Sequence, residues 1–194
     1  MSANGNPSTG LRIIGGRLKG KRLHSVPGPI IRPTGNRQRE SMFNILSDAV
    51  VGAVVLDLFA GTGILGIEAL SRGANFAVFL DRFRGAISVI ERNIRSCKLE
   101  DRTKIIPWNI RHGLSCLKAQ PFQFNLVFMD PPYNRENIRP ALTNLYKTGC
   151  LKVGSTIVIE HCAREKVSVD ETAYILTDQR RYGKTLVTFL SYMV

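Results

Sequence analysis

Two short motifs contain residue types that can carry out chemistry. Residues 56–63 read Leu-Asp-Leu-Phe-Ala-Gly-Thr-Gly, and residues 127–133 read Val-Phe-Met-Asp-Pro-Pro-Tyr. The first joins an apolar run to a carboxylate and a glycine turn, which is typical of the strand-to-helix junction where α/β sheets bind nucleoside cofactors. The second is an extended corner, because each proline holds φ at about −65°. Together the motifs predict methylation of an amino nitrogen with S-adenosylmethionine.

The first motif supplies most of the predicted cofactor contacts. Gly61 and Gly63 let the backbone approach a cofactor where a side chain would collide. S-adenosylmethionine has a charged amino acid end and no pyrophosphate, so Asp57 can assist its binding, whereas a pyrophosphate would be repelled. Asp81, at the end of the next apolar run, is expected to accept both ribose hydroxyls. Gly61, Gly63 and Gly66 also match the Gly-x-Gly-x-x-Gly spacing of nicotinamide enzymes, which leaves an oxidoreductase as an alternative.

Three further residues complete the predicted cofactor site. Asn109 follows the third predicted strand, where its side-chain oxygen can meet an adenine amino group, and Ile110 offers a backbone N–H. Phe59, the last residue of the first predicted strand, lies between Asp57 and the glycines.

The second motif is the predicted reacting corner. The lone pair of an exocyclic amine on a purine is spread into the ring, which makes that amine a poor nucleophile. If the Asp130 carboxylate and the Pro131 carbonyl accept its two N–H bonds, the nitrogen can turn pyramidal and aim its lone pair at the methyl group. Tyr133 is expected to stack on the base, a contact worth about 1–3 kcal/mol.

A net charge of +12 and a pI near 10.0 indicate a polyanionic partner. The charge is clustered, because no acidic residue occurs between Leu11 and Arg39. We expect this cluster to bind RNA phosphates. Its members are Arg12, Arg17, Lys19, Lys21, Arg22, Arg32, Arg37 and Arg39.

Other features narrow the class of protein. The 194 residues, 44% of them hydrophobic, suit one moderate domain. No run reaches the roughly 18 apolar residues of a membrane helix, and the first ten residues lack a signal-peptide pattern, so we expect a cytoplasmic protein without a membrane partner. The four cysteines and three histidines show no metal-ligand spacing, so no metal is expected.

Strands and helices alternate from residue 54 onward, which predicts an α/β, Rossmann-like, doubly wound parallel sheet. The last two strands are separated by four residues, too few for a crossover, so the final strand should pair antiparallel. Residues 11–14 and 21–26 suggest a small hairpin. Thr34 or Asn36 is expected to cap a helix that precedes the first strand of the sheet. The predicted strands are 54–59, 77–81, 104–107, 125–129, 156–160, 174–180 and 185–192, and the predicted helices 64–71, 85–97, 113–118 and about 136–147.

The predicted organisation has three parts: a disordered tail over 1–10, a basic β-hairpin and linker over 11–35 that binds RNA, and a methyltransferase domain over 36–194. The hairpin is expected to lie outside the cofactor sheet. Its removal is therefore expected to spare cofactor binding.

These motifs resemble the bacterial RsmD-type methyltransferases, which modify the N2 amine of a guanine in 16S rRNA. The resemblance implies a seven-stranded methyltransferase sheet, S-adenosyl-L-methionine as cofactor, and a hairpin that helps to grip RNA on the small ribosomal subunit or its assembly intermediate. We expect a monomer. The third cofactor position is usually an aspartate in this family, and this chain has Asn109. The motifs that carry the resemblance are residues 12–23, 32–34, 39–40, 43–46, 57–63, 65–73, 130–133 and 181–183.

Three alternatives remain besides the oxidoreductase. The same tetrapeptide chemistry serves a DNA adenine-N6 or a protein glutamine-N5 methyltransferase, although these would need a larger target-recognition region than the N-terminal segment offers. From a different class, the chain could be a non-catalytic RNA-binding assembly factor, against which the intact Asp130, Pro131 and Tyr133 argue.

Overall fold

Seven strands form one mixed sheet in the computed structural model, which describes residues 10–26, 35–118, 120–121, 123–132, 137–165, 167 and 169–194. The order across the sheet is β3-β2-β1-β4-β5-β7-β6. β1 to β5 are mutually parallel, and β7 is antiparallel to both β5 and β6, as predicted. The strands are β1 (Val54–Leu58), β2 (Phe76–Asp81), β3 (Thr103–Pro107), β4 (Phe124–Met129), β5 (Leu151–Cys162), β6 (Tyr174–Tyr182) and β7 (Thr185–Tyr192).

The strand order reverses between β1 and β4. From β1 the chain proceeds outward through β2 to β3 and then returns to place β4 on the other side of β1. Ligands of open α/β sheets bind at such a switch point, outside the carboxyl ends of the strands. The fold therefore favours a site where β1 and β4 end.

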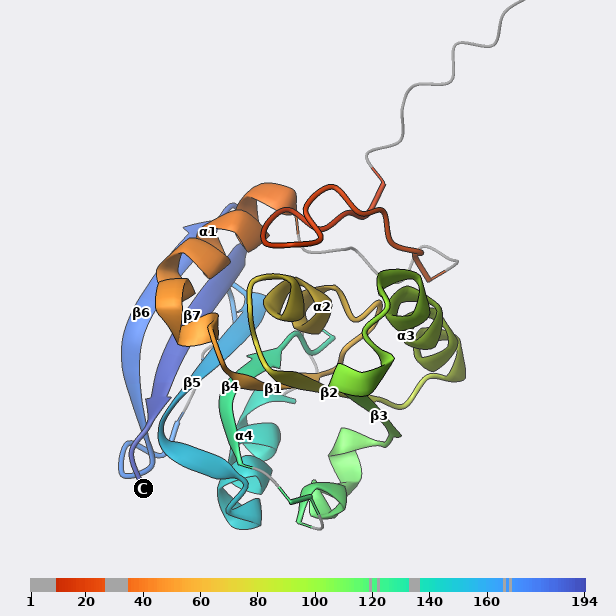
Figure 1. The fold of residues 1–194 in the computed structure, drawn as a ribbon. Helices are drawn as coiled ribbons and strands as arrows, with labels where there is room; N and C mark the ends of the chain where they lie inside the picture. Colours follow the sequence, from red (N-terminus) through yellow and green to blue (C-terminus); the bar gives the residue numbers. More distant parts are fainter. Residues whose placement is uncertain are drawn as a thin grey trace, which may run out of the picture.

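Helices cover both faces of the sheet (Figure 1). α1 (Asn36–Leu46), α2 (Ile64–Ser71) and α3 (Arg84–Cys97) pack on one face, and α4 (Ile138–Thr148) packs on the other. Successive strand residues point to opposite faces, so Phe79 and Phe128 join the core under α1 to α3, whereas Leu80 and Met129 join the core over α4. Within the described residues, no helix has the length and apolar character that a membrane crossing requires.

Residues 10–26, here called the arm, cover α2. This helix is buried along its whole length, so it needs protein on the side away from the sheet. Ser71 supplies three of the contacts: its hydroxyl donates to Gly15 O and accepts from Leu18 N, and its carbonyl accepts from Arg17 N. Gly16 fits because its φ is +69° and a Cβ there would lie 2.0 Å from the Ser71 carbonyl oxygen.

The arm has hairpin-like backbone hydrogen bonds, but its described residues contain no continuous strands. The predicted runs form a single antiparallel bridge between Arg12 and Arg22, with Ile13 N donating to Lys21 O at 3.0 Å. Leu11, Ile13 and Leu23 join the hydrophobic core beneath α1 to α3. The arm thus lies outside the sheet, as expected, but forms part of the core.

Several predicted boundaries differ from the structure. β5 extends from Leu151 to Cys162, well beyond the predicted 156–160, because its start continues the pairing with β4 across a bulge. The predicted helix over 113–118 is a 3-10 turn, η4 (Ser115–Leu117). α1 begins after Gly35 without a side-chain cap, so Asn36 is not a cap. Thr34 and the predicted tail lie outside the described residues, apart from Gly10.

Candidate active site

Four adjacent strands carry an acid at or just beyond the carboxyl end. In order across the sheet these are Asp81 on β2, Asp57 on β1, Asp130 immediately after β4, and Glu160 on β5. The neighbours of these acids in the chain, Leu80, Leu58, Met129 and Ile159, all pack toward α4. Because successive strand residues point to opposite faces, all four acidic side chains lie on the face that α2 covers. The acids therefore line one edge of one face.

The register sets the heights of these acids. Leu80, Leu58, Met129 and Ile159 are paired across the four strands and form one row of the sheet. Asp81, Asp130 and Glu160 each come one residue after a member of this row, so they lie at the same height along the strands. Asp57 comes one residue before Leu58, so it lies on the other side of the row and points to the opposite face from Leu58. The pairs that fix the row are Leu58 with Leu80, Leu58 with Met129, and Met129 with Ile159.

A cavity of about 740 Å³ opens at this edge. Its volume is in the range of small-molecule and cofactor sites. Gly63 is not part of the lining, and Tyr133 lies outside the described residues. The lining includes eight residues that the sequence predicted, namely Asp57, Phe59, Gly61, Asp81, Asn109, Ile110, Asp130 and Pro131.

Two features fix the conformation of the loop after β1: residues with left-handed backbone dihedral angles and hydrogen bonds to Asp81. Phe59, Gly61 and Gly63 have φ values of 60°, 57° and 75°, in the left-handed region. One Asp81 oxygen accepts from Gly61 N and the other from Phe83 N, both at 2.9 Å. Gly63 shapes the turn that starts α2, and Asp81 fixes the loop against β2.

Asp57 lies beneath this loop and is only 2% exposed. Its carboxylate accepts from Gly66 N at 3.0 Å, where a Cβ would lie 2.4 Å from the Phe79 ring, so α2 approaches β1 through a glycine. Burial raises the pKa of Asp57 to about 8; the Gly66 N–H opposes the shift and the charge of Asp81 adds to it. A cationic ligand would favour the ionised form.

Asp130 lies in the cavity wall next to Glu160. Burial raises the pKa of Asp130 well above its usual range, and the charges of Glu160 and Asp57 raise it further. Perturbed carboxyl groups gathered in one cavity are a mark of functional sites. Their combined negative potential suits a ligand that brings positive charge or several N–H donors.

A polar chain joins the predicted adenine side of the cavity to the tetrapeptide. The Asn109 side chain accepts from Arg111 N at 3.3 Å and caps the 3-10 turn η3 (Ile110–His112). Arg111 Nε donates to Asn137 Oδ1 at 3.2 Å, and Asn137 Nδ2 donates to Pro132 O at 3.5 Å. Asn137 thus supports the corner, and nothing in the sequence singled it out.

Sequence reasoning also missed the cavity wall beyond Asp130. Glu160 lines it together with the β6–β7 turn and the first turn of α1, which contributes Gln38. The signal for Glu160 was present, because Ile157-Val-Ile-Glu160 repeats the pattern of an apolar run ending in an acid that marks the other three strands.

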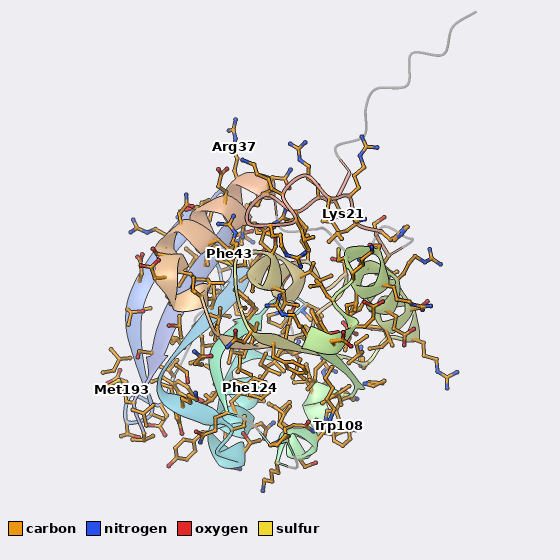
Figure 2. All side chains as sticks on the ribbon, in the orientation of Figure 1. Lys21, Arg37, Phe43, Trp108, Phe124 and Met193 are labelled. Carbon is orange, nitrogen blue, oxygen red and sulfur yellow. The ribbon has the colours of Figure 1, made fainter. Side chains whose placement is uncertain are left out.

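The predicted RNA-binding residues divide into exposed and buried members. Figure 2 shows Lys21 on the arm and Arg37 pointing outward from α1 on the same side of the molecule. Arg37 is adjacent in sequence to Gln38, which lines the cavity. Arg32 lies outside the described residues. The exposed members are Arg12, Arg17, Lys19, Lys21, Arg22 and Arg37.

Arg39 contradicts the prediction of an RNA contact, because it is 0% exposed. Its Nε lies 3.6 Å from Glu68 Oε2, and its Nη2 donates to Arg12 O at 2.6 Å. Glu68 also binds Arg72 at 2.9 Å and accepts from Ile14 N at 2.9 Å. The buried Arg39 therefore ties α1, α2 and the arm together, a role that a charge cluster cannot reveal.

Asn93 connects the arm to the glycine loop. His24 N donates to Asn93 Oδ1 at 2.7 Å, and Asn93 Nδ2 donates to Thr62 O at 2.9 Å. Asn93 is fully buried on α3. The position of the arm is thereby linked to the loop that borders the cavity.

The sheet order, the switch-point cavity and the strand-end acids define a Rossmann-like methyltransferase. The solved structure of yhhF from Escherichia coli superposes with a TM-score of 0.82 at 29% identity, covering 94% of this chain and 98% of that one. The family described as Conserved hypothetical protein 95 matches residues 11–191, and the chain belongs to this family, the RsmD family.

Two relatives show the extent of the match. YlbH of Bacillus subtilis is 34% identical over 177 residues, which cover 90% of this chain and 95% of YlbH. Ribosomal RNA small subunit methyltransferase D of Escherichia coli is 34% identical over 157 residues, covering 81% of this chain and 77% of that protein.

Proposed function

We propose that the protein transfers a methyl group from S-adenosylmethionine to the N2 amine of a guanine in 16S rRNA. The observation that carries this proposal is the cavity in which Asp57 and Asp81 meet the Asp130-Pro131 corner at the switch point. The family supports the same substrate, since the Escherichia coli relative is named as a small-subunit ribosomal RNA methyltransferase.

The residues on the β1 and β2 side fit the proposed cofactor. S-adenosylmethionine supplies an electrophilic methyl group on a positively charged sulfur. The buried Asp57 carboxyl provides negative potential for its cationic amino acid end, and Asp81 retains acceptor capacity for ribose hydroxyls beyond its two backbone donors. Asn109 and Ile110 lie in the cavity wall that would face the adenine.

The residues on the β4 side would hold the target amine. The Asp130 carboxylate and the Pro131 carbonyl accept its N–H bonds, so that the nitrogen lone pair points toward the methyl group. Asp130 can also take the proton that the amine loses, because its raised pKa makes it a suitable base. Tyr133 lies outside the described residues, and its stacking on the flipped base stays a prediction.

The exposed cations of the arm and Arg37 would bind phosphates around the target nucleotide. This surface favours a polyanion, and the partner we propose is 16S rRNA within the small subunit or its assembly intermediate. We propose that the protein acts on this partner in the cytoplasm and as a monomer. The acid-lined corner argues against a non-catalytic assembly factor, because a protein that only bound RNA would gain nothing from buried carboxyls beside a nucleoside-sized cavity.

The test uses small-subunit particles from cells that lack this methyl group. The particles are incubated with the purified protein and S-adenosylmethionine, and the nucleosides of 16S rRNA are then analysed by mass spectrometry. One new N2-methylguanosine is expected with the unaltered protein and none with Asp130→Ala. An N6-methyladenosine product, or no product with the unaltered protein, would overturn the proposal.

A further inference from the structure

The cavity continues past Asp130, away from the proposed cofactor side. The residues assigned to the cofactor lie on β1 and β2 and in the loops that follow β1, β2 and β3, whereas the opposite wall is formed by β5, the β6–β7 turn and the start of α1. With the target amine at Asp130, the rest of the base must extend toward this opposite wall. Glu160, Tyr182 and Lys184 are among the residues there.

Glu160 is the acid of that wall. It is 6% exposed, so its contact with the outside is through the cavity. Met129 pairs with Ile159, which places Glu160 level with Asp130 on the adjacent strand, about 4.8 Å away in the backbone. Both side chains point to the face that α2 covers, because each follows a residue that packs toward α4. Two carboxyl groups thus lie side by side, with Glu160 farther from the cofactor side.

The strand holds Glu160 in a fixed place. β5 is paired on both edges, with β4 on one side and with β7 on the other, where Glu160 itself pairs with Val187. Sites built on paired strands hold their side chains more precisely than sites on loops. A group that distinguishes two similar bases needs such precision.

The edge of guanine that contains the 2-amine presents two neighbouring donors, the N2 amine and N1–H. Adenine and 2-aminopurine also carry an amine, but the adjacent N1 is an acceptor without a hydrogen. A carboxylate opposite N1 therefore accepts a hydrogen bond from guanine and meets lone-pair repulsion from the other two bases. Two adjacent carboxyl groups match the guanine pattern and mismatch the others.

We propose that Glu160 accepts the N1–H of the target guanine while Asp130 holds its 2-amine, so that Glu160 determines the preference for guanine. This inference rests on the proposed function, and it assigns to Glu160 the discrimination between guanine and bases that present an acceptor at N1.

The test compares two bases that share the 2-amine. Small-subunit particles are reconstituted with 16S rRNA that carries either guanine or 2-aminopurine at the target nucleotide. Methylation rates are measured for the unaltered protein and for Glu160→Gln, whose amide can accept from N1–H or donate to N1. The unaltered protein should prefer guanine by about 10- to 100-fold, the usual range when one hydrogen bond to a base edge is mismatched. In Glu160→Gln the preference should collapse toward unity.

Two controls separate this role from a structural one. Calorimetry with S-adenosylmethionine should give the same affinity for Glu160→Gln as for the unaltered protein, because Glu160 is on the far side of Asp130 from the cofactor. Glu91→Gln, an equal change of charge on the outer surface of α3, should keep the full preference for guanine.

The failures of the two proposals are distinguishable. If the unaltered protein methylates guanine and Glu160→Gln keeps the same preference over 2-aminopurine, the role of Glu160 is wrong and the proposed function stands. If Glu160→Gln loses cofactor affinity together with activity, the residue is structural and the inference is overturned. If the unaltered protein methylates neither base, the proposed function fails, and the inference fails with it.

Discussion

The cavity at the switch point and the arm over α2 are the two regions with unusual charge, and they use it in opposite ways. The cavity places Asp57 and Glu160 inside the protein and Asp130 in its wall, where burial, and then the charges of Glu160 and Asp57, raise the pKa of Asp130. The arm places most of its cations outside and turns the backbone and Leu11, Ile13 and Leu23 inward. Buried charge here marks a site for chemistry, and exposed charge a surface for binding.

Arg39 is the exception to this division. It belongs to the basic cluster in sequence, but it is buried against Glu68 beneath the arm. Because Asn93 also joins the arm to the glycine loop, the arm is packed onto the site as well as extending its surface. Removing residues 1–26 would therefore expose α2, so deletion of the arm is a poor test of RNA binding.

The largest expected effect is on the chemistry of the cavity. Asp130→Ala should lower the rate of methyl transfer by about 10²- to 10⁴-fold, because it removes the acceptor and base for the target amine. S-adenosylmethionine affinity should change little, since Asp130 is on the target side. Single-turnover methylation and calorimetry measure the two effects. A parallel loss of both would show that Asp130 serves the cofactor instead.

A second substitution tests the anchoring of the arm. Glu68→Gln should destabilise the protein by about 3–5 kcal/mol, because it leaves a buried Arg39 without its counter-charge. Denaturant unfolding measures this loss. Glu91→Gln is the matched control, since it breaks an exposed pair with Arg95 at 3.9 Å and should have little effect. Equal stabilities for the two variants would contradict the anchoring role.

The buried acid of the cavity predicts a pH effect on the cofactor-free protein. The folded pKa of Asp57 is about 8 against an ordinary value of 3.8, so the folded state holds a proton that the unfolded state releases. The stability contribution of the protonated group is fully present below pH 3.8 and is lost as the pH rises to about 8.

Asp57→Asn removes this dependence. Its unfolding temperature, relative to that of the unaltered protein, should increase across the same pH window, while its affinity for S-adenosylmethionine falls. Thermal unfolding from acid to mildly alkaline pH, without cofactor, is the measurement. A constant difference between the two proteins would show that Asp57 does not titrate there.

The smallest effect concerns the exposed cations of the arm. Replacing Arg17, Lys19 and Lys21 with alanine should leave stability and cofactor affinity unchanged, because these side chains are exposed. Binding to small-subunit particles should weaken, and the log-log dependence on salt should become shallower by about 0.7–0.9 for each phosphate that the arm no longer binds. The control replaces Lys118, Lys147 and Lys152, which are exposed away from the arm. An equal change in slope for both triple variants would mean that the arm has no special role.

The cofactor side of the cavity was predictable because it is local in sequence. A strand, a glycine turn and a helix within residues 54–71 fix the geometry of Asp57 and Gly61 through the chain itself. Glu160 was harder to predict, because an acid at a strand end acquires meaning only when the strand order places it beside Asp130. Arg39 and Asn137 were not predictable, since their burial depends on contacts with segments far away in sequence.

The central claim, that the acid-lined cavity methylates the N2 amine of a guanine in 16S rRNA, is tested most directly in cells that lack this protein. Nucleoside mass spectrometry of their 16S rRNA should show one N2-methylguanosine missing from its normal position. The unaltered protein should restore it, and Asp130→Ala, expressed at the same level, should not. An unchanged methylation pattern in the deletion strain, or full restoration by Asp130→Ala, would contradict the claim.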